Sequence, residues 1–301
     1  MLYQAYDAQS DMFSPVRQMA RLALSSFGQE QPTKNWFGAN HAVAAYELID
    51  RAGLTHARPS FNIAQVRVGN REVAVTEEVA LKLPFGTLLH FKKDIGVVQP
   101  SVLVVAPLSG HFATLLRNTA LTLLADHDVY ITDWHNARDV PLERGPFGFD
   151  DYVTYLIRFM EQIGTDCHVV SVCQPCVQTL AAVAVMAEGR NACQPRSMTL
   201  MAGPVDTRIN PTEVNKLASG KPISWFKSNL IAQVPRRYPG AGRKVYPGFI
   251  QLSAFMSMNM QRHIKAHKDL YNHIVKGEID KATAIKTFYD EYFAVLDLPA
   301  E

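Results

Sequence analysis

The spacing of apolar residues predicts two helices followed by an antiparallel hairpin at the start of the chain. Apolar residues recur at helical spacing over residues 3–27 and 40–52, and a glycine follows the second stretch. The pattern then changes to alternation in residues 61–68 and 71–75, which flank a Gly-Asn turn. A further strand is predicted at 88–91, so this part of the chain adds a small antiparallel group of strands to the helices.

After this hairpin, continuous apolar runs alternate with amphipathic stretches. Residues 101–106 are nearly all apolar, as expected of a strand that is covered on both faces of a parallel sheet. The other predicted strands are 129–132, 166–172 and 197–201, and the predicted helices between them are 113–125, one from about 150, and 177–187. This alternation predicts right-handed crossovers, and therefore an α/β fold with a doubly wound, mostly parallel sheet.

Beyond residue 206 the predicted strands stop. Residues 207–248 are rich in Pro, Gly and basic residues, and two amphipathic helices are predicted at 248–275 and 281–296. We interpret this helical block as an inserted lid. The expected organisation is an N-terminal helical segment, 1–58, an α/β core, 59–206, and a helical lid, 207–301, with the last strands of the core fold missing.

Composition indicates a globular enzyme, with 48% hydrophobic and 19% charged residues. The formal charge of +2 argues against a nucleic-acid partner, which requires many clustered Lys or Arg. The first residues lack a positive leader and an apolar core, and the apolar run at 169–187 is interrupted by Gln and Pro. We therefore expect a cytoplasmic protein with no signal peptide and no membrane partner, whose four cysteines are thiols.

The turn between the predicted strand 166–172 and the helix after it carries the candidate chemistry. Cys173 stands at its apex, where the sulfur is outside both elements and the first amides of the helix favour negative charge nearby. This arrangement matches the nucleophile elbow of the α/β-hydrolases in part. Ser171 is the small residue required before the nucleophile, but Pro175 stands where glycine is usual.

The loop at residues 107–110 follows the first parallel strand, beside the elbow. An oxyanion hole in an α/β-hydrolase uses one backbone N–H from this loop and one from the residue after the nucleophile. We therefore expect Gln174 to supply one donor and either Leu108 or Ser109 to supply the other. No metal and no bound cofactor are expected.

Two other interpretations of the same cysteines stay open. Residues 173–176, Cys-Gln-Pro-Cys, have the form of a thiol–disulfide redox pair at a helix N-terminus. Thioredoxin-like domains, however, carry this motif near the start of a short series of alternating strands and helices, whereas here it lies deep in a long series. A zinc site would need Cys167 and Cys193 to join the pair, yet Cys167 lies within a predicted strand and no second Cys-x-x-Cys occurs.

Four segments together carry a family resemblance: 171–175 (Ser-Val-Cys-Gln-Pro), 130–138 (Tyr-Ile-Thr-Asp-Trp-His-Asn-Ala-Arg), 149–152 (Phe-Asp-Asp-Tyr) and 201–206 (Met-Ala-Gly-Pro-Val-Asp). With them the chain resembles, over essentially its whole length, the intracellular polyhydroxyalkanoate (polyhydroxybutyrate) depolymerases, cysteine-dependent relatives of the polyester synthases. The resemblance implies that Cys173 is the nucleophile and Cys176 a bystander. It further implies cleavage of 3-hydroxyalkanoate esters through a cysteine acyl-enzyme, by hydrolysis or by thiolysis with coenzyme A as acceptor.

A polyester granule in the cytoplasm is the expected partner. Met256, Met258 and Met260 on one predicted helix, and the aromatic residues of 288–293 on the other, would offer it an adaptable apolar surface. The alternative is that these side chains pack the predicted lid on the sheet.

A cysteine nucleophile in this fold also needs an acid and a histidine on loops after later strands. Because no strand is predicted after residue 206, we expect these partners beyond Glu301, in a C-terminally incomplete enzyme, and a non-catalytic granule-binding fragment is a third interpretation. His111 and His135 are the candidates for a substitute base. Simpler roles are expected for the remaining candidates: His168 within the sheet, His263, His267 and His273 on the wetter side of a lid helix, and Asp133 and Asp206 as caps.

Overall fold

The computed structural model describes residues 2–27 and 38–300 of the chain. Met1, residues 28–37 and Glu301, which fall in the expected segments 1–58 and 207–301, lie outside the described residues. The chain forms two compact units, one made of Met1–Pro59 and Gly248–Val295, the other of Ser60–Pro247 and Leu296–Glu301. The early helices and the helices after residue 248 therefore belong to one unit, and the sheet to the other.

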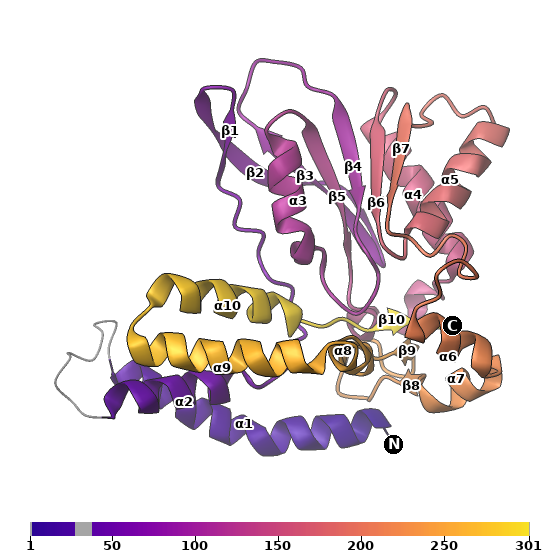
Figure 1. The fold of residues 1–301 in the computed structure, drawn as a ribbon. Helices are drawn as coiled ribbons and strands as arrows, with labels where there is room; N and C mark the ends of the chain where they lie inside the picture. The colour runs from indigo at the N-terminus through magenta and orange to yellow at the C-terminus, as the bar shows by residue number, and fades with distance from the viewer. Residues whose placement is uncertain (1, 28–37, 301) are drawn as a thin grey trace. The chain divides into compact units, whose positions relative to one another are not determined.

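A seven-stranded sheet forms the centre of the second unit, in the order β1-β2-β3-β5-β4-β6-β7 (Figure 1). The strands are β1 (Gln65–Val68), β2 (Arg71–Leu83), β3 (Gly86–Lys93), β4 (Ser101–Val105), β5 (Asp128–Trp134), β6 (His168–Val172) and β7 (Ser197–Met201). β1, β2 and β3 pair antiparallel, β3 pairs antiparallel with β5, and β5, β4, β6 and β7 are parallel. This order, with the candidate turn directly after β6, confirms the predicted α/β-hydrolase type of fold and its N-terminal hairpin.

Helices cover both faces of the sheet, as the doubly wound prediction requires. Leu103 and Val105 of β4 belong to one hydrophobic core, which α4 (Phe149–Ile163) and α5 (Cys176–Glu188) complete. The other core contains Val102 and Val104 with the buried side of α3 (Arg117–Leu124). Because neighbouring strand residues point to opposite faces, an apolar run at every position is what a strand buried on both sides needs.

The expectation that strands stop after residue 206 is wrong. β8 (Ala232–Gln233), β9 (Lys244–Tyr246) and β10 (Leu298–Pro299) form a small antiparallel sheet, apart from the seven-stranded one. Two short helices precede it, α6 (Glu213–Gly220) and α7 (Ile223–Asn229). Strands of two or three residues are too short to show an alternating pattern, which is why the sequence did not reveal them.

A fully buried arginine joins this region to the loop after β5. The guanidinium of Arg243 donates hydrogen bonds to the carbonyls of Val140 (3.1 Å), Pro141 (2.9 Å) and Gly145 (3.0 Å). It also lies 4.9 Å from the centroid of the Phe85 ring. A buried charge is tolerated only when its donors are satisfied, so these carbonyls and the arginine depend on one another.

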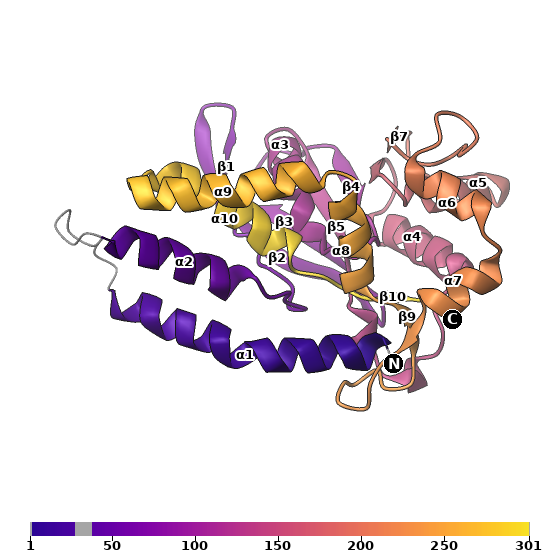
Figure 2. The ribbon, with the colours of Figure 1, turned by 60° about the horizontal axis from the view of Figure 1, so that its bottom comes forward.

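The first unit consists of helices: α1 (Leu2–Ser26), α2 (Ala39–Arg51), α8 (Gly248–Ser257), α9 (Met260–Lys276) and α10 (Ile279–Tyr292). α1 and α2 run antiparallel side by side (Figures 1 and 2). The helix predicted at 248–275 is two helices, since Asn259 leaves the helical conformation. Met256 and Met260 keep helical spacing across this break, so the apolar pattern concealed it.

Two histidines of α9 contact α10, which corrects their expected place on the wetter side of the helix. His263 Nδ1 lies 2.9 Å from the hydroxyl of Tyr289, and its ring stacks on Tyr292. The ring centroids of His267 and Tyr289 are 4.3 Å apart. Both histidines are half-buried between the helices.

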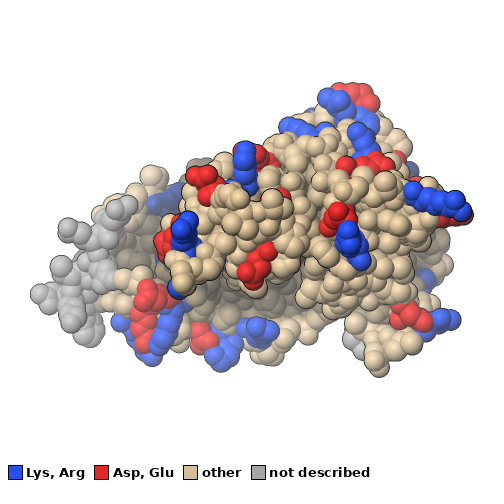
Figure 3. Space-filling model, turned by 90° about the horizontal axis from the view of Figure 1, so that it is seen from above, with Lys and Arg blue, Asp and Glu red and all other residues tan. Residues whose placement is uncertain are grey.

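The surface carries charges of both signs, and on the face shown in Figure 3 Lys and Arg lie among Asp and Glu. Of the helices in residues 2–27 and 38–300, none is both long enough and apolar enough to cross a membrane.

Candidate active site

Cys173 occupies the turn between β6 and α5 in a strained backbone conformation. Its φ of 69° lies in the left-handed region, which costs a residue with a Cβ on the order of 1 kcal/mol or more. The N–H of Cys173 donates to the carbonyl of Met201 (2.8 Å), and its carbonyl accepts from the N–H of Cys176 (3.2 Å). The neighbouring strand and the first turn of the helix thus hold the strained turn from both sides, as in a nucleophile elbow.

Two small residues, Ser171 and Gly203, make this turn possible, and only Ser171 was predicted from the sequence. Ser171 is fully buried, and its hydroxyl accepts a hydrogen bond from Thr179 Oγ1 at 3.0 Å. Gly203, in the loop after β7, is the residue that sequence reasoning missed. A Cβ at this position would lie 2.1 Å from the Cβ of Cys176 and 3.0 Å from the carbonyl oxygen of Cys173. No spacing rule reveals this requirement, because the contact joins the loop after β7 to the start of α5, which are distant in sequence.

The two cysteines of the Cys-Gln-Pro-Cys motif have different surroundings. Cys173 is partly exposed, whereas Cys176 is buried, and both are thiols. The Cys176 sulfur lies 3.4 Å from the carbonyl oxygen of Ser171 and 3.7 Å from that of Met201, to which it donates. Cys176 therefore packs the inside of the turn, and Cys173 is the more accessible of the two thiols.

The two remaining cysteines lie near each other, away from the motif. Burial, with a smaller contribution from Cys193, raises the pKa of the Cys167 thiol to about 11. No group of three or more His, Cys, Asp or Glu side chains among the described residues is placed to hold a metal ion.

A cavity of about 320 Å³ lies beside the elbow, within the second unit. Gln174, Pro175 and Gln178 line it from the elbow and α5, and Leu108 lines it from the loop after β4. Aromatic and apolar side chains complete the lining: Phe147, Phe149, Tyr152, Leu298 and Pro299. The cavity thus brings together two of the three residues predicted as oxyanion donors.

The predicted donors have amides that are not used elsewhere. Among the described residues, the backbone N–H groups of Leu108, Ser109 and Gln174 donate no hydrogen bond. The loop that carries Leu108 and Ser109 is held in place by the next residue, Gly110, whose carbonyl accepts a hydrogen bond from the N–H of Leu296 (2.9 Å). A fixed loop with unused amides is the arrangement that an oxyanion hole requires. The choice between Leu108 and Ser109 stays a prediction, although only Leu108 lines the cavity.

Gln178 is a second residue that the sequence did not single out. It lies one helical turn beyond Gln174 and lines the same cavity. Its Oε1 is buried without a hydrogen-bond partner among the described residues. A buried acceptor left unsatisfied costs about 1–3 kcal/mol, so this atom favours a donor, such as a hydroxyl group or water, in the cavity.

His135, one of the two candidates for a substitute base, has a structural role. Its Nδ1 lies 2.9 Å from the carbonyl of Pro84 and its Nε2 lies 2.8 Å from the hydroxyl of Thr87. Both ring nitrogens therefore connect the end of β5 to β3 and to the turn before it. His111, the other candidate, is buried in the loop after β4.

The other predicted residues have simple roles. His168 Nδ1 lies 2.7 Å from Ser197 Oγ on the neighbouring strand, as expected of a histidine within the sheet. Asp206 is exposed, and its hydrogen bond to the Arg208 guanidinium lowers the pKa of the carboxyl. In the part of the chain that the structure describes, no histidine hydrogen-bonds the Cys173 sulfur. The geometry therefore places a partly exposed thiol beside unused backbone amides, and among the described residues it assigns no base.

Residues 202–301 match a family model described as "PHB de-polymerase C-terminus". The match covers 100 of the 301 residues and begins directly after β7, so it does not include Cys173. Among the curated proteins, none matches the chain.

The chain is also similar to solved structures of low sequence identity. A candidate lipase from Acinetobacter baumannii AYE is 14% identical over 87% of this chain and 72% of its own, with a TM-score of 0.39. The naproxen esterase of Bacillus subtilis is 12% identical over 62% of this chain and 56% of its own (TM-score 0.34). The chain spans 44% of a hypothetical protein from Pseudomonas aeruginosa PAO1, about half of its length. The strand order of the seven-stranded sheet identifies the fold independently of these similarities.

Proposed function

We propose that this chain is an ester hydrolase of the polyhydroxyalkanoate depolymerase type, with Cys173 as the nucleophile. The observation that carries the proposal is the left-handed, doubly hydrogen-bonded turn that presents Cys173 between β6 and α5. The family match at 202–301 supports the substrate class, because it links this chain to depolymerases of PHB.

In the proposed mechanism, the Cys173 thiolate attacks the ester carbonyl carbon and forms a carbon–sulfur bond, while the carbonyl electrons move to oxygen. The N–H of Gln174 and an N–H of Leu108 or Ser109 stabilise this oxyanion. Collapse of the intermediate breaks the carbon–oxygen bond and releases the 3-hydroxyacyl alcohol, which takes up a proton. Water, or a thiol such as that of coenzyme A, then attacks the thioester carbonyl and breaks its bond to the Cys173 sulfur. The 3-hydroxy acid or its coenzyme A thioester leaves, and the proton of the attacking group restores the Cys173 thiol.

We further propose that the first unit provides the surface that meets a polyester granule in the cytoplasm. It exposes apolar side chains on its helices and on the turn between α8 and α9: Met258, Met260 and Phe288 are 54%, 44% and 48% exposed, and Met12 and Met19 of α1 are 65% and 70% exposed. Methionine is flexible enough to adapt to an irregular apolar surface. This adds α1 to the helices that the sequence singled out for this role.

The nucleophile is tested by incubating the chain with p-nitrophenyl 3-hydroxybutyrate and locating the acyl group by mass spectrometry. We expect one acyl group, on Cys173, and none in Cys173→Ala. Cys176→Ala is the matched control and retains the acyl group, because Cys176 is buried. An activated ester is chosen because it requires little help from a base. Acylation of both cysteines alike, or of neither, would contradict the proposal.

The redox alternative predicts a different result in the same samples. A redox pair would reduce insulin disulfides and form a bridge between Cys173 and Cys176, and both single variants would lose this activity. Binding of polymer granules without an acyl-enzyme would instead indicate a non-catalytic granule-binding fragment.

A further inference from the structure

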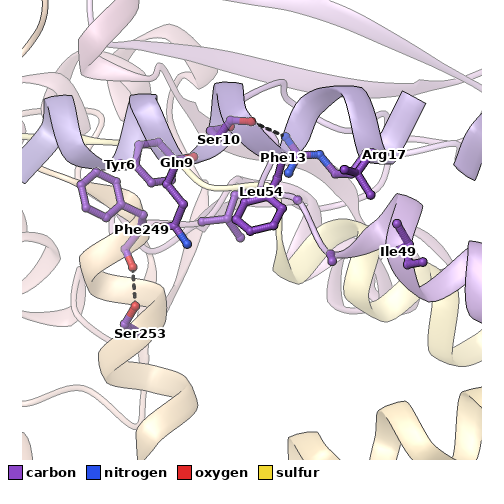
Figure 4. A pocket seen from close by; sticks show the side chains of 12 residues that line it. Tyr6, Gln9, Ser10, Phe13, Arg17, Ile49, Leu54, Phe249 and Ser253 are labelled. Atoms are coloured by element: carbon purple, nitrogen blue, oxygen red, sulfur yellow. Dashed lines mark hydrogen bonds between the residues drawn. The ribbon is translucent and has the colours of Figure 1, made fainter. Parts of the chain in front are cut away.

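A second cavity, of about 590 Å³, lies entirely within the first unit (Figure 4). Its walls are α1, the end of α2 with the residues that follow it, and α8. The lining is mainly apolar and aromatic: Tyr6, Phe13, Val16, Ile49, Leu54 and Phe249. Cavities of about 300–1,000 Å³ with apolar walls and a few polar groups are the usual form of a small-molecule site.

Arg17 supplies a positive charge to the lining of this cavity. Its guanidinium donates to the carbonyl of Ser10 (2.9 Å), and among the described residues it forms no ion pair with a carboxylate. Arg21, one turn further along α1, is paired with Asp50 at 2.9 Å. Arg17 therefore keeps donors that a ligand can use.

Gly53 leaves the space that the Arg17 side chain occupies, because it has no Cβ. A Cβ there would lie 2.8 Å from Nε and 2.9 Å from Cδ of Arg17, so the arginine side chain lies directly on the Gly53 backbone. With Ser10 on one side and Gly53 on the other, the guanidinium is held in place before a ligand arrives. Such preorganisation reduces the entropy that binding costs.

The apolar residues extend away from the charge. In Figure 4, Phe13 and Leu54 lie between Arg17 and the rings of Tyr6 and Phe249. Those two rings are stacked, with centroids 4.1 Å apart and an angle of 7° between their planes. The lining thus carries a charge at Arg17 and aromatic rings at Tyr6 and Phe249, with apolar side chains between them.

We infer that this cavity binds an aliphatic carboxylate of the size of a fatty acid. The carboxylate pairs with the Arg17 guanidinium, which matches it in a bidentate fashion, and the chain runs along Phe13 and Leu54 towards Tyr6 and Phe249. This inference does not depend on the proposed ester hydrolysis, because none of the lining residues belongs to the elbow or its cavity.

The test is isothermal titration of the 301-residue chain with decanoate. We expect saturable binding, with octanoate about 15-fold weaker, because each buried methylene contributes about fourfold. Decan-1-ol, which has no charge, and Arg17→Gln should each lower the affinity at least about tenfold. Arg21→Gln is the matched control on the same helix, and its affinity should stay unchanged because Arg21 pairs with Asp50.

Two further variants test whether decanoate binds in this cavity. Gly53→Ala should weaken decanoate binding with a native circular dichroism spectrum, because the new methyl group displaces the Arg17 side chain. Cys173→Ala should bind decanoate as the unmodified chain does. No saturable binding, equal affinity in Arg17→Gln, equal affinity for decan-1-ol, or loss of binding in Cys173→Ala would each overturn the inference.

Discussion

Gly203→Ala tests whether the loop after β7 sets the geometry of the elbow. The new Cβ would lie 2.1 Å from the Cβ and 2.4 Å from the sulfur of Cys176, and 3.0 Å from the carbonyl oxygen of Cys173. Carbon atoms in contact prefer about 3.5–4.0 Å, so the loop and the start of α5 must separate by roughly 1.5 Å. The same movement strains the hydrogen bond between the Cys173 N–H and the Met201 carbonyl.

The expected loss in the free energy of unfolding combines two contributions. Overpacking a buried site costs about 1–3 kcal/mol, and loss of one hydrogen bond adds about 1 kcal/mol. Together they amount to about 2–4 kcal/mol, and at about 2–4 °C per kcal/mol the melting temperature should fall by roughly 4–16 °C. Thermal unfolding followed by circular dichroism measures this shift. Gly220→Ala is the control, because a Cβ there meets no atom within 4 Å.

Changes at Cys176 separate this clash from a general effect of replacing glycine. Cys176→Gly removes both clashing side-chain atoms, so the double variant Cys176→Gly/Gly203→Ala should regain most of the lost stability, less up to about 1 kcal/mol for a glycine in a helix. Cys176→Ala/Gly203→Ala keeps the Cβ at 2.1 Å and should regain little. Equal rescue by the two changes, or a Gly203→Ala chain as stable as the original, would refute the reasoning.

Three further predictions concern stability. Cys173→Gly should raise the free energy of unfolding, measured by urea denaturation, by about 1 kcal/mol, because glycine adopts a positive φ without strain. Cys173→Ala keeps the strain and should leave this free energy unchanged. Burial raises the pKa of the Cys167 thiol from 9.0 to about 11. The buried neutral thiol therefore contributes fully to the free energy of unfolding below pH 9, and this contribution is lost as the pH rises to about 11. Relative to Cys167→Ala, the original chain should lose up to about 2 kcal/mol over this range, and parallel pH profiles would contradict the assignment. Asn136→Ala should cost about 1–3 kcal/mol, since Oδ1 accepts from the Asp297 N–H at 3.0 Å, and an unchanged urea midpoint would argue against it.

The regular elements were predictable where burial imposes a period. β4 is apolar on both faces because both faces are covered, and the hairpin of β1 and β2 follows from alternation around a Gly-Asn turn. Elements of two or three residues, such as β8 and β10, carry too few positions to show any period. The break at Asn259 was concealed because the apolar stripe continues in phase across it.

The candidate site was predictable where neighbours in sequence form it. Cys173 and Gln174 follow from the strand–turn–helix pattern, which the structure reproduces. Gly203 could not be found in this way, because its contact with Cys176 depends on the packing of β6 beside β7. His135 shows the opposite limit: its position at a strand end suits a base, but Thr87 and Pro84, which are distant in sequence, occupy both ring nitrogens.

The buried Arg243 has a consequence for the design of chimaeras. The family match begins at residue 202, which suggests a segment that can be exchanged between relatives as a cassette. Arg243 lies inside that segment, while Val140, Pro141 and Gly145, whose carbonyls it binds, lie outside. A chimaera with another side chain at position 243 would leave these buried carbonyls without their hydrogen-bond donor. An exchange of this segment therefore has to include residues 137–145 as well.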